Sequence, residues 1–190
     1  MSRLITNAIR STSASADAIT FDNSGKPAFP NGGAGKILQV VSTQKSDVFT
    51  WGTTGDVAIT GMTVSITPSS NASKVLVQVQ IGASGVYNDA FPIFWQLYKG
   101  GSQISGAKGS GTSGTTVKCA SYSKNYVYYV GTSTSFSFLD SPATTSATTY
   151  QLYGQRHSSS GTAYFNATAQ QVNERYAETI STITAMEVGA

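Results

Sequence analysis

Few residues in this sequence could carry out acid–base or nucleophilic chemistry. The chain has one histidine, His157, and one cysteine, Cys119, so a hydrolytic triad could use only His157 as its base. His157 stands in QRHSSSG (155–161), a composition typical of a hairpin turn, and we expect a turn residue there. A single cysteine excludes an intrachain disulfide and, with one histidine, argues against a transition-metal site.

The carboxylates are dispersed as well. A glycosidase needs two facing carboxyl groups, and the nearest pair in sequence is Glu174 with Glu178, in the one helix-like patch, which we expect to be a loop. Asp89 and Asp140 could hold Ca²⁺ between strands, but neither has acidic neighbours, so turn capping is favoured. We therefore predict no catalytic, cofactor or metal site and no enzyme activity. The acidic residues are Asp17, Asp22, Asp47, Asp56, Asp89, Asp140, Glu174, Glu178 and Glu187.

Two short motifs match functional patterns without the context that those patterns need. GSGTSG (109–114) fits the dinucleotide-binding spacing, yet no strand precedes it and no helix follows it. The sequons at Asn71 and Asn166 carry little weight, since no secretory signal accompanies them. Neither motif indicates a ligand or a modification.

Charge and hydropathy exclude two classes of partner. The net charge is +3, but the twelve Lys and Arg residues are scattered singly, so we expect no nucleic-acid binding. Tyrosines interleave with lysine over 122–129, and we favour a structural strand or subunit contact there over base stacking. No apolar run approaches the roughly 20 residues that cross a bilayer, and MSRLITNAIR lacks a signal core. We expect no membrane insertion.

The composition predicts an all-β protein. Only 11% of residues are charged, whereas Ser and Thr number 27 and 24, so hydroxyl groups must solvate the surface in place of Lys and Glu. Thr, Val, Tyr and Phe favour strands, and the ten Tyr and eight Phe argue against disorder. Strand signals separated by turn residues recur along the chain. The predicted strands are 37–42, 47–51, 57–66, 74–82, 91–99, 101–106, 126–130, 134–139, 149–156, 162–169 and 180–188.

We divide the chain into a segment 1–35 and a domain 36–190. In the domain, alternation of apolar and polar residues over 74–81, 150–153 and 163–167 predicts short strands in a two-sheet β-sandwich. The first 35 residues have spaced apolar side chains and many turn signals, so we expect an extended arm that docks on a neighbouring molecule. A flexible tail is the alternative. The candidate anchor residues are Leu4, Ile5, Ile9, Ile19, Phe21 and Phe29.

Aromatic residues exceed what one small core needs. We expect some of Trp95, Tyr98, Tyr126 and Tyr128 to form a subunit interface, because aromatic side chains are enriched in such contacts. The alternative is that all of them are core residues or scattered surface residues.

Several motifs of the domain resemble the small tail-fibre-like or spike-like structural proteins of bacterial viruses, especially marine and cyanobacterial phages. The resemblance covers most of 36–190 and implies a jelly-roll domain, a homotrimer and an N-terminal segment that joins other virion proteins. It implies no shared cofactor or active site. The motifs are GKILQVV (35–41), GMTVSITPSS (61–70), SKVLV (73–77), SFSFLDSP (135–142), TTY (148–150) and ITAMEVGA (183–190).

Three functional classes remain open. A host-attachment fibre or spike would bind a surface glycan or protein, whereas a capsid-decorating head fibre or cement protein would bind and stabilise only the particle. A depolymerase is the third class, which the missing carboxylate cluster disfavours. For a fibre we expect recognition by exposed loops around 84–90, 107–124 and 157–161, which carry Gly, Ser, Asn and Tyr. In the first two classes the protein is located in the virion.

Overall fold

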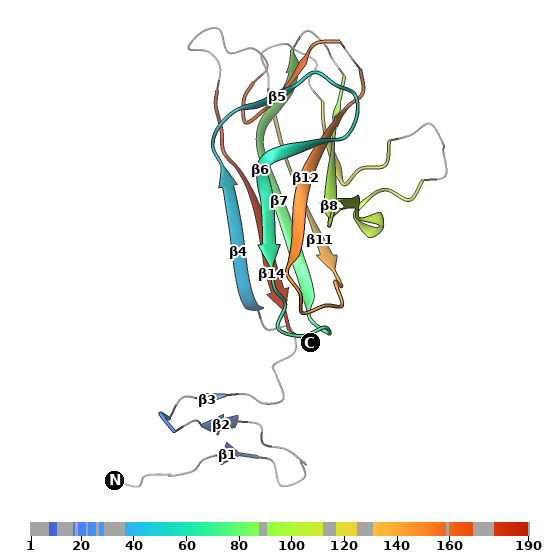
Figure 1. Cartoon of the computed structure of the whole chain (residues 1–190). Coiled ribbons are helices and arrows are strands. Elements are labelled where there is room, and N and C mark those ends of the chain that lie inside the picture. Colours follow the sequence, from blue (N-terminus) through green and yellow to red (C-terminus); the bar gives the residue numbers. More distant parts are fainter. Residues whose placement is uncertain are drawn as a thin grey trace.

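The computed structural model of the chain describes residues 8–10, 17, 19–21, 23–25, 27–28, 37–87, 91–111, 117–124, 131–158, 160–168 and 177–189. These residues form antiparallel strands and one short 3-10 turn, which confirms the all-β prediction. From residue 37 onward the strands make two sheets, arranged as a sandwich (Figure 1).

The first sheet contains β4 (Ile37–Lys45), β5 (Phe49–Trp51), β7 (Lys74–Tyr87), β11 (Thr132–Asp140), β13 (Thr162–Phe165) and β14 (Ser181–Val188). The long strand β7 is its centre. It pairs with β11 along one edge and with β14 and then β13 along the other. β14 pairs further with β4, and β13 with β5.

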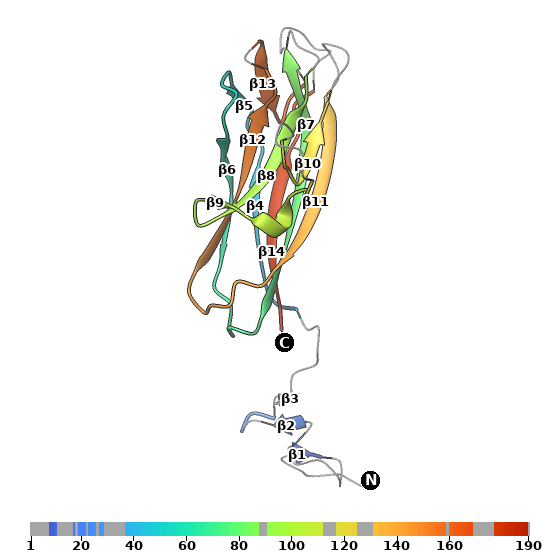
Figure 2. The same cartoon turned by 90° about the vertical axis from the view of Figure 1, so that its right-hand side faces the viewer.

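The second sheet contains β6 (Val57–Ile66), β8 (Ile93–Lys99), β9 (Ser102–Gln103), β10 (Ser121–Ser123) and β12 (Thr148–Arg156). Its order is β10-β8-β12-β6, and β9 pairs with the end of β8. A 3-10 turn, η1 (Ser105–Ala107), follows β9. Figure 2 shows η1 and β10 on the side of the sandwich where β11 ends the first sheet.

Eight of these strands form four antiparallel pairs that nest along the sequence. When the short β5, β9 and β13 are set aside, the first strand pairs with the last, β4 with β14. The second pairs with the seventh, β6 with β12, and the third with the sixth, β7 with β11. The fourth, β8, pairs with the fifth, β10. The outer pairs therefore join segments that are far apart in sequence.

The inner faces of the two sheets form one apolar core. Val75, Val77 and Val79 on β7 are fully buried, while Gln78 and Gln80, which follow Val77 and Val79, are exposed. This is the alternation that the sequence predicts, since successive side chains of a strand point to opposite faces. Tyr150, Leu152, Ala163 and Phe165 are likewise fully buried, as expected.

β7 is longer than the sequence predicts. It runs to Tyr87, whereas the predicted strand covers 74–82. A side chain at Gly82 would collide with Thr179 and Ile180, which cross close above it. The hydroxyl groups of Ser181 and Thr179 accept hydrogen bonds from the Gly82 and Ala83 amides, at 2.9 and 2.7 Å. Glycine therefore permits a close approach here and does not end the strand.

Other elements also differ from the sequence predictions or cannot be compared with them. The segment with His157 is not a hairpin turn, because β12 and β13 on either side of it belong to different sheets. The sequence also missed β10, which has only three residues. The strand expected at 126–130 and the helix-like patch up to residue 176 lie outside the described residues.

Asn166 was expected on an exposed strand face but is fully buried at the end of β13. Its φ of 64° lies in the left-handed region, so the strand stops there. Its Nδ2 donates to the Lys45 and Asp47 carbonyls at 2.8 and 3.2 Å, and its Oδ1 accepts from the Ser181 hydroxyl at 2.5 Å. Asn166 thus joins the β4–β5 turn to the start of β14.

Glu187 is a buried acid on the inward face of β14, with 1% of its surface exposed. Its Oε1 accepts hydrogen bonds from the backbone N and the hydroxyl of Ser69, at 2.7 and 2.6 Å. Burial acts to raise the pKa of this carboxyl, but the hydrogen bonds outweigh it and hold the pKa below the ordinary 4.5. The carboxylate therefore ties β14 to the β6–β7 turn.

We expect Glu187 to make the fold sensitive to acid. Because its folded-state pKa is lowered, its stabilisation is complete above the unfolded-state pKa and is lost as the pH falls through the folded-state value. Glu187→Gln should therefore lower stability near neutrality and flatten the decline below pH 4.5. Urea unfolding at a series of pH values measures both effects. The exposed Glu178→Gln is the control, and a Glu187→Gln curve parallel to wild type would contradict the assignment.

The described residues of the N-terminal segment pair with one another. β1 (Ala8–Ile9), β2 (Ile19–Phe21) and β3 (Pro27–Ala28) form a small antiparallel sheet, separate from the two sheets of the sandwich. Gly25, with a φ of 77°, makes the turn from β2 to β3. The predicted extended arm therefore contains short paired strands.

Candidate functional site

Side chains of His, Cys, Asp and Glu among the described residues could act as acids, bases or metal ligands where they lie close together. Within the described part of the chain, no three His, Cys, Asp or Glu side chains are placed to hold a metal ion. His157 packs against the rings of Phe91 and Phe94, with centroids 4.9 and 6.3 Å apart. Cys119 is half-buried, and burial raises the pKa of its thiol. Glu174 lies outside the described residues, so its pairing with Glu178 is not placed.

The sequence predicts that Asp140 caps a turn, but the structure shows that it is the buried last residue of β11. Its Oδ2 accepts hydrogen bonds from Lys99 Nζ and Tyr150 Oη, each at 2.7 Å. Burial is the main cause that raises the pKa of Tyr150, and the hydrogen bond to Asp140 is the second. The Tyr150 hydroxyl therefore keeps its proton and donates it to the carboxylate in a hydrogen bond. The carboxylate thus has a structural role between the sheets, one that only their packing could reveal. Asp89 lies outside the described residues.

Trp95 is not available to a second subunit, contrary to the expectation for this residue. It is fully buried on β8, with ring centroids 6.2 Å from Trp51 and 5.6 Å from Phe165. Its Nε1 donates to the Ser123 hydroxyl at 2.7 Å. The side chain points into the core because strand phase, not residue type, selects the face. Tyr126 and Tyr128 lie outside the described residues.

Tyr98 lies on the outer surface of the second sheet, in a group of side chains that we call the aromatic face. Here β8 and β12 pair in a register that sets Phe94 beside Gln155, Gln96 beside Tyr153 and Tyr98 beside Gln151. Tyr122 on β10 continues the row of Phe94 and is 61% exposed. The aromatic face consists of Phe94, Gln96, Tyr98, Tyr122, Gln151, Tyr153 and Gln155.

Asp56, in the loop before β6, lies against the middle of the aromatic face. Its Oδ1 accepts from Gln96 Nε2 at 2.6 Å and its Oδ2 from Tyr98 Oη at 2.5 Å. Gln96 Nε2 also donates to Gln155 Oε1 at 3.3 Å. The Tyr98 and Tyr153 rings stack, with centroids 3.8 Å apart. Burial, with the bond to Asp56, raises the pKa of Tyr98, so its hydroxyl remains protonated and orients the carboxylate.

The outer surface of the first sheet carries a different feature, which we call the apolar row. Val40, Met186, Leu76 and Leu139 are direct register partners across β4, β14, β7 and β11. Val40 is 58% and Leu139 47% exposed, and the other two are half-buried. The row crosses the sheet near the start of β4, the end from which the N-terminal segment enters (Figure 1).

Beyond the apolar row, the same surface is polar. The next row consists of Ser42, Thr184, Gln78 and Ser137. The row after it consists of Gln44, Thr182, Gln80 and Ser135. Exposed apolar residues on this sheet are therefore gathered at one end. Isolated exposed apolar residues need no explanation, but a contiguous patch is typical of an interaction surface.

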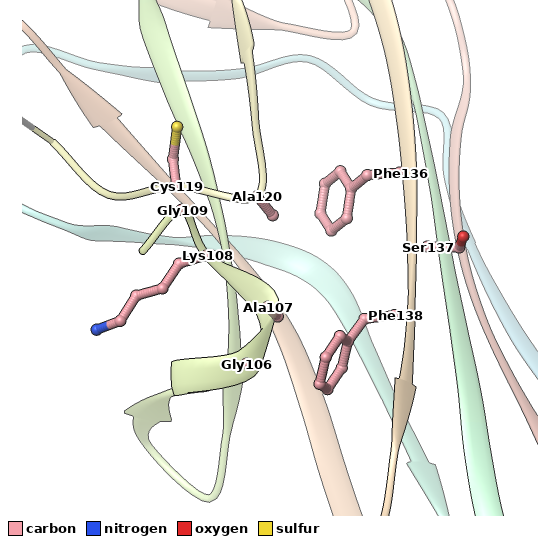
Figure 3. A pocket seen from close by; sticks show the side chains of 9 residues that line it. All are labelled: Gly106, Ala107, Lys108, Gly109, Cys119, Ala120, Phe136, Ser137 and Phe138. Atoms are coloured by element: carbon pink, nitrogen blue, oxygen red, sulfur yellow. The ribbon is translucent and has the colours of Figure 1, made fainter. Parts of the chain in front are cut away.

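A third feature is a pocket of about 350 Å³ on the side of the sandwich beside β11. Figure 3 shows the rings of Phe136 and Phe138 directed at Ala107 and Ala120, with the Lys108 and Cys119 side chains pointing away from them. The volume is near the lower end for ligand pockets, and no set of polar groups converges on the two rings. The two rings and the alanines opposite them suit an apolar side chain.

The candidate anchor residues are only partly described. Ile9 on β1 is 45% exposed, and Ile19 and Phe21 on β2 are half-buried. Leu4, Ile5 and Phe29 lie outside the described residues. An anchoring role for this segment stays a prediction.

No family model and no curated protein matches this chain. No helix in the described ranges is long and apolar enough to span a membrane.

Sequence reasoning missed the apolar row and the role of Asp56. Leu76, Met186 and Leu139 each occupy an outward position of a strand whose other outward positions are mostly polar. This exception to the alternation could have indicated a second apolar face. No local signal could have placed Asp56 over β8, because the contact depends on how β6, β12 and β8 are ordered in the sheet.

Proposed function

We propose that this chain is a structural protein of a bacteriophage particle, a short tail fibre or spike that attaches the virion to the host surface. The nested strand order is the observation that carries the proposal. Four antiparallel pairs, first with last through fourth with fifth, support a jelly roll, an architecture that viral capsid proteins and lectins use. The motifs that resemble phage fibre and spike proteins lie mostly in these strands.

The apolar row supports a further part of this proposal, assembly as a homotrimer. Four apolar side chains in register on the outer face of one sheet give a surface that a second copy can cover. We therefore move the proposed subunit contact from Trp95 and Tyr98 to this sheet. The row lies at the end where the 1–35 segment enters, so one end of the trimer would carry three anchor segments for other virion proteins.

Capsid decoration, as a head fibre or cement protein, is the second candidate. It is favoured by the described residues of the N-terminal segment, which pair into a small sheet of their own that could dock on the particle and show no repetitive shaft. Both candidates place the protein in the virion and neither requires catalysis. They differ in where on the particle it lies.

Immunogold labelling of phage particles that encode the chain tests the proposal. We expect antibodies against domain 36–190 to label the tail or its fibres, and label over the head would favour capsid decoration. Particles assembled with a chain lacking 1–35 should lose the label, whereas the truncated domain should remain folded by circular dichroism. Absence of label from particles with the intact chain would refute a virion role.

A further inference from the structure

The aromatic face and Asp56 together provide three kinds of group that hold a sugar: aromatic rings, amides and a carboxylate. Sugar rings present apolar C–H groups on their faces, which pack on aromatic rings, and hydroxyls at their edges, which bond to amides and carboxylates. Tyr122, Tyr153 and Phe94 supply ring surface, and Gln151 and Gln155 supply amides, all from paired strands of one sheet. Tyrosine is suited to both tasks, since it has an apolar ring and a polar tip.

Asp56 is the best placed hydrogen-bonding group on this surface. The residue is exposed, yet Gln96 and Tyr98 each hold one of its carboxylate oxygens. A carboxylate can accept about four hydrogen bonds, so two positions remain for ligand hydroxyls. Because neighbouring side chains already fix the carboxylate, binding would cost little conformational entropy.

The charge of the surface restricts the kind of glycan. No Lys or Arg is among the outward-facing described residues of β6, β8, β10 and β12. Lys99 and Arg156 belong to β8 and β12 but are directed elsewhere: Lys99 binds the buried Asp140, and Arg156 is buried. Asp56 would repel sulfate or carboxylate groups nearby. A neutral sugar suits these charges best.

We infer that the aromatic face, centred on Asp56 and the Tyr98–Tyr153 pair, binds a neutral hexose-containing glycan. This inference rests on the proposed attachment function and identifies the chemistry of the receptor. It moves recognition from the loops that the sequence suggests to the surface of a sheet. Paired strands hold their side chains at fixed spacing, so this surface is more rigid than a loop.

Titration of the purified full chain with neutral oligosaccharides tests the inference. The probes are maltohexaose, cellohexaose and mannohexaose, with a heparin fragment as the anionic comparison, and saturation-transfer NMR and calorimetry detect binding. We expect at least one neutral hexaose to bind and heparin not to. Asp56→Asn and Tyr153→Leu should each weaken binding by about tenfold, through a lost charge-assisted hydrogen bond and a lost ring. Thr184→Ala, on the outer face of the other sheet, should bind like wild type.

Three results would overturn the inference. Binding of no neutral hexaose is the first, and binding that Asp56→Asn and Tyr153→Leu leave unchanged, which would indicate another site, is the second. The third is that either variant sediments as a monomer while the wild-type chain sediments as an oligomer. This result would show that the face is a subunit contact. Asp56 is exposed, so Asp56→Asn should fold even if Tyr153→Leu does not. Glycan binding without particle label would refute the virion role alone, and label without glycan binding would refute this inference alone.

Discussion

Replacing Val40 and Leu139 together by lysine is expected to convert a trimer into folded monomers. Both side chains are about half exposed in the single chain, so the substitutions should cost its fold little. At a subunit contact they would place charges in an apolar interface, where burying an unpaired ammonium is far more costly than the interface gains from one side chain. Sedimentation velocity at micromolar concentration measures the change in mass.

The matched control for this prediction is Gln44→Lys. Gln44 is exposed on the same outer face of β4 as Val40, but in a polar row. It should leave the trimer intact, which separates the effect of position from that of added charge. A wild-type chain that sediments as a monomer would contradict the trimer. A double variant that remains trimeric would place the contact elsewhere on the surface.

Asn166→Ala is expected to destabilise the domain by about 2–4 kcal/mol. The substitution removes three hydrogen bonds and leaves the Lys45 carbonyl and the Ser181 hydroxyl without this partner in a buried place. It also puts alanine at a φ of 64°, where asparagine is better tolerated. The loss should appear as a lower urea midpoint with an unchanged m-value.

Asn71→Ala is the control for this second prediction. Asn71 belongs to the same type of sequon but is exposed in the turn between β6 and β7, so its loss should change stability by less than about 0.5 kcal/mol. An Asn166→Ala midpoint equal to that of Asn71→Ala would mean that the buried network does not stabilise the fold. The burial of Asn166 also argues that its sequon is structural, since the side-chain amide is bonded inside the domain.

The strands could be predicted from sequence because the signal for them is local. Val75, Val77 and Val79 alternate with polar residues, and each burial follows from a two-residue repeat that needs no knowledge of the partner strand. The same holds for Tyr150 and Leu152. Composition likewise sufficed for the all-β class, since Ser and Thr replace the charged residues of helical surfaces.

The site could not be predicted in this way, because each of its contacts joins distant segments. Asp56 meets Gln96 and Tyr98 across 40 and 42 residues, and only the order of β6, β12 and β8 brings them together. Leu76 and Leu139 form part of an apolar surface only because four paired strands place their outward apolar residues in one row. Neither arrangement has a signature within a single strand.

By itself, the sequence determined which residues form strands and which face of most strands is buried, since both depend on neighbours one or two positions away. The tertiary structure decided the use of particular polar and aromatic residues. Trp95 is a core residue, and Asp140 is a buried hydrogen-bond acceptor. Gly82 lies inside a strand where the segment with Thr179 and Ile180 passes close to it. Residue type sets what a side chain can do, but strand order and register set what it meets, and those follow from the packing of the whole domain.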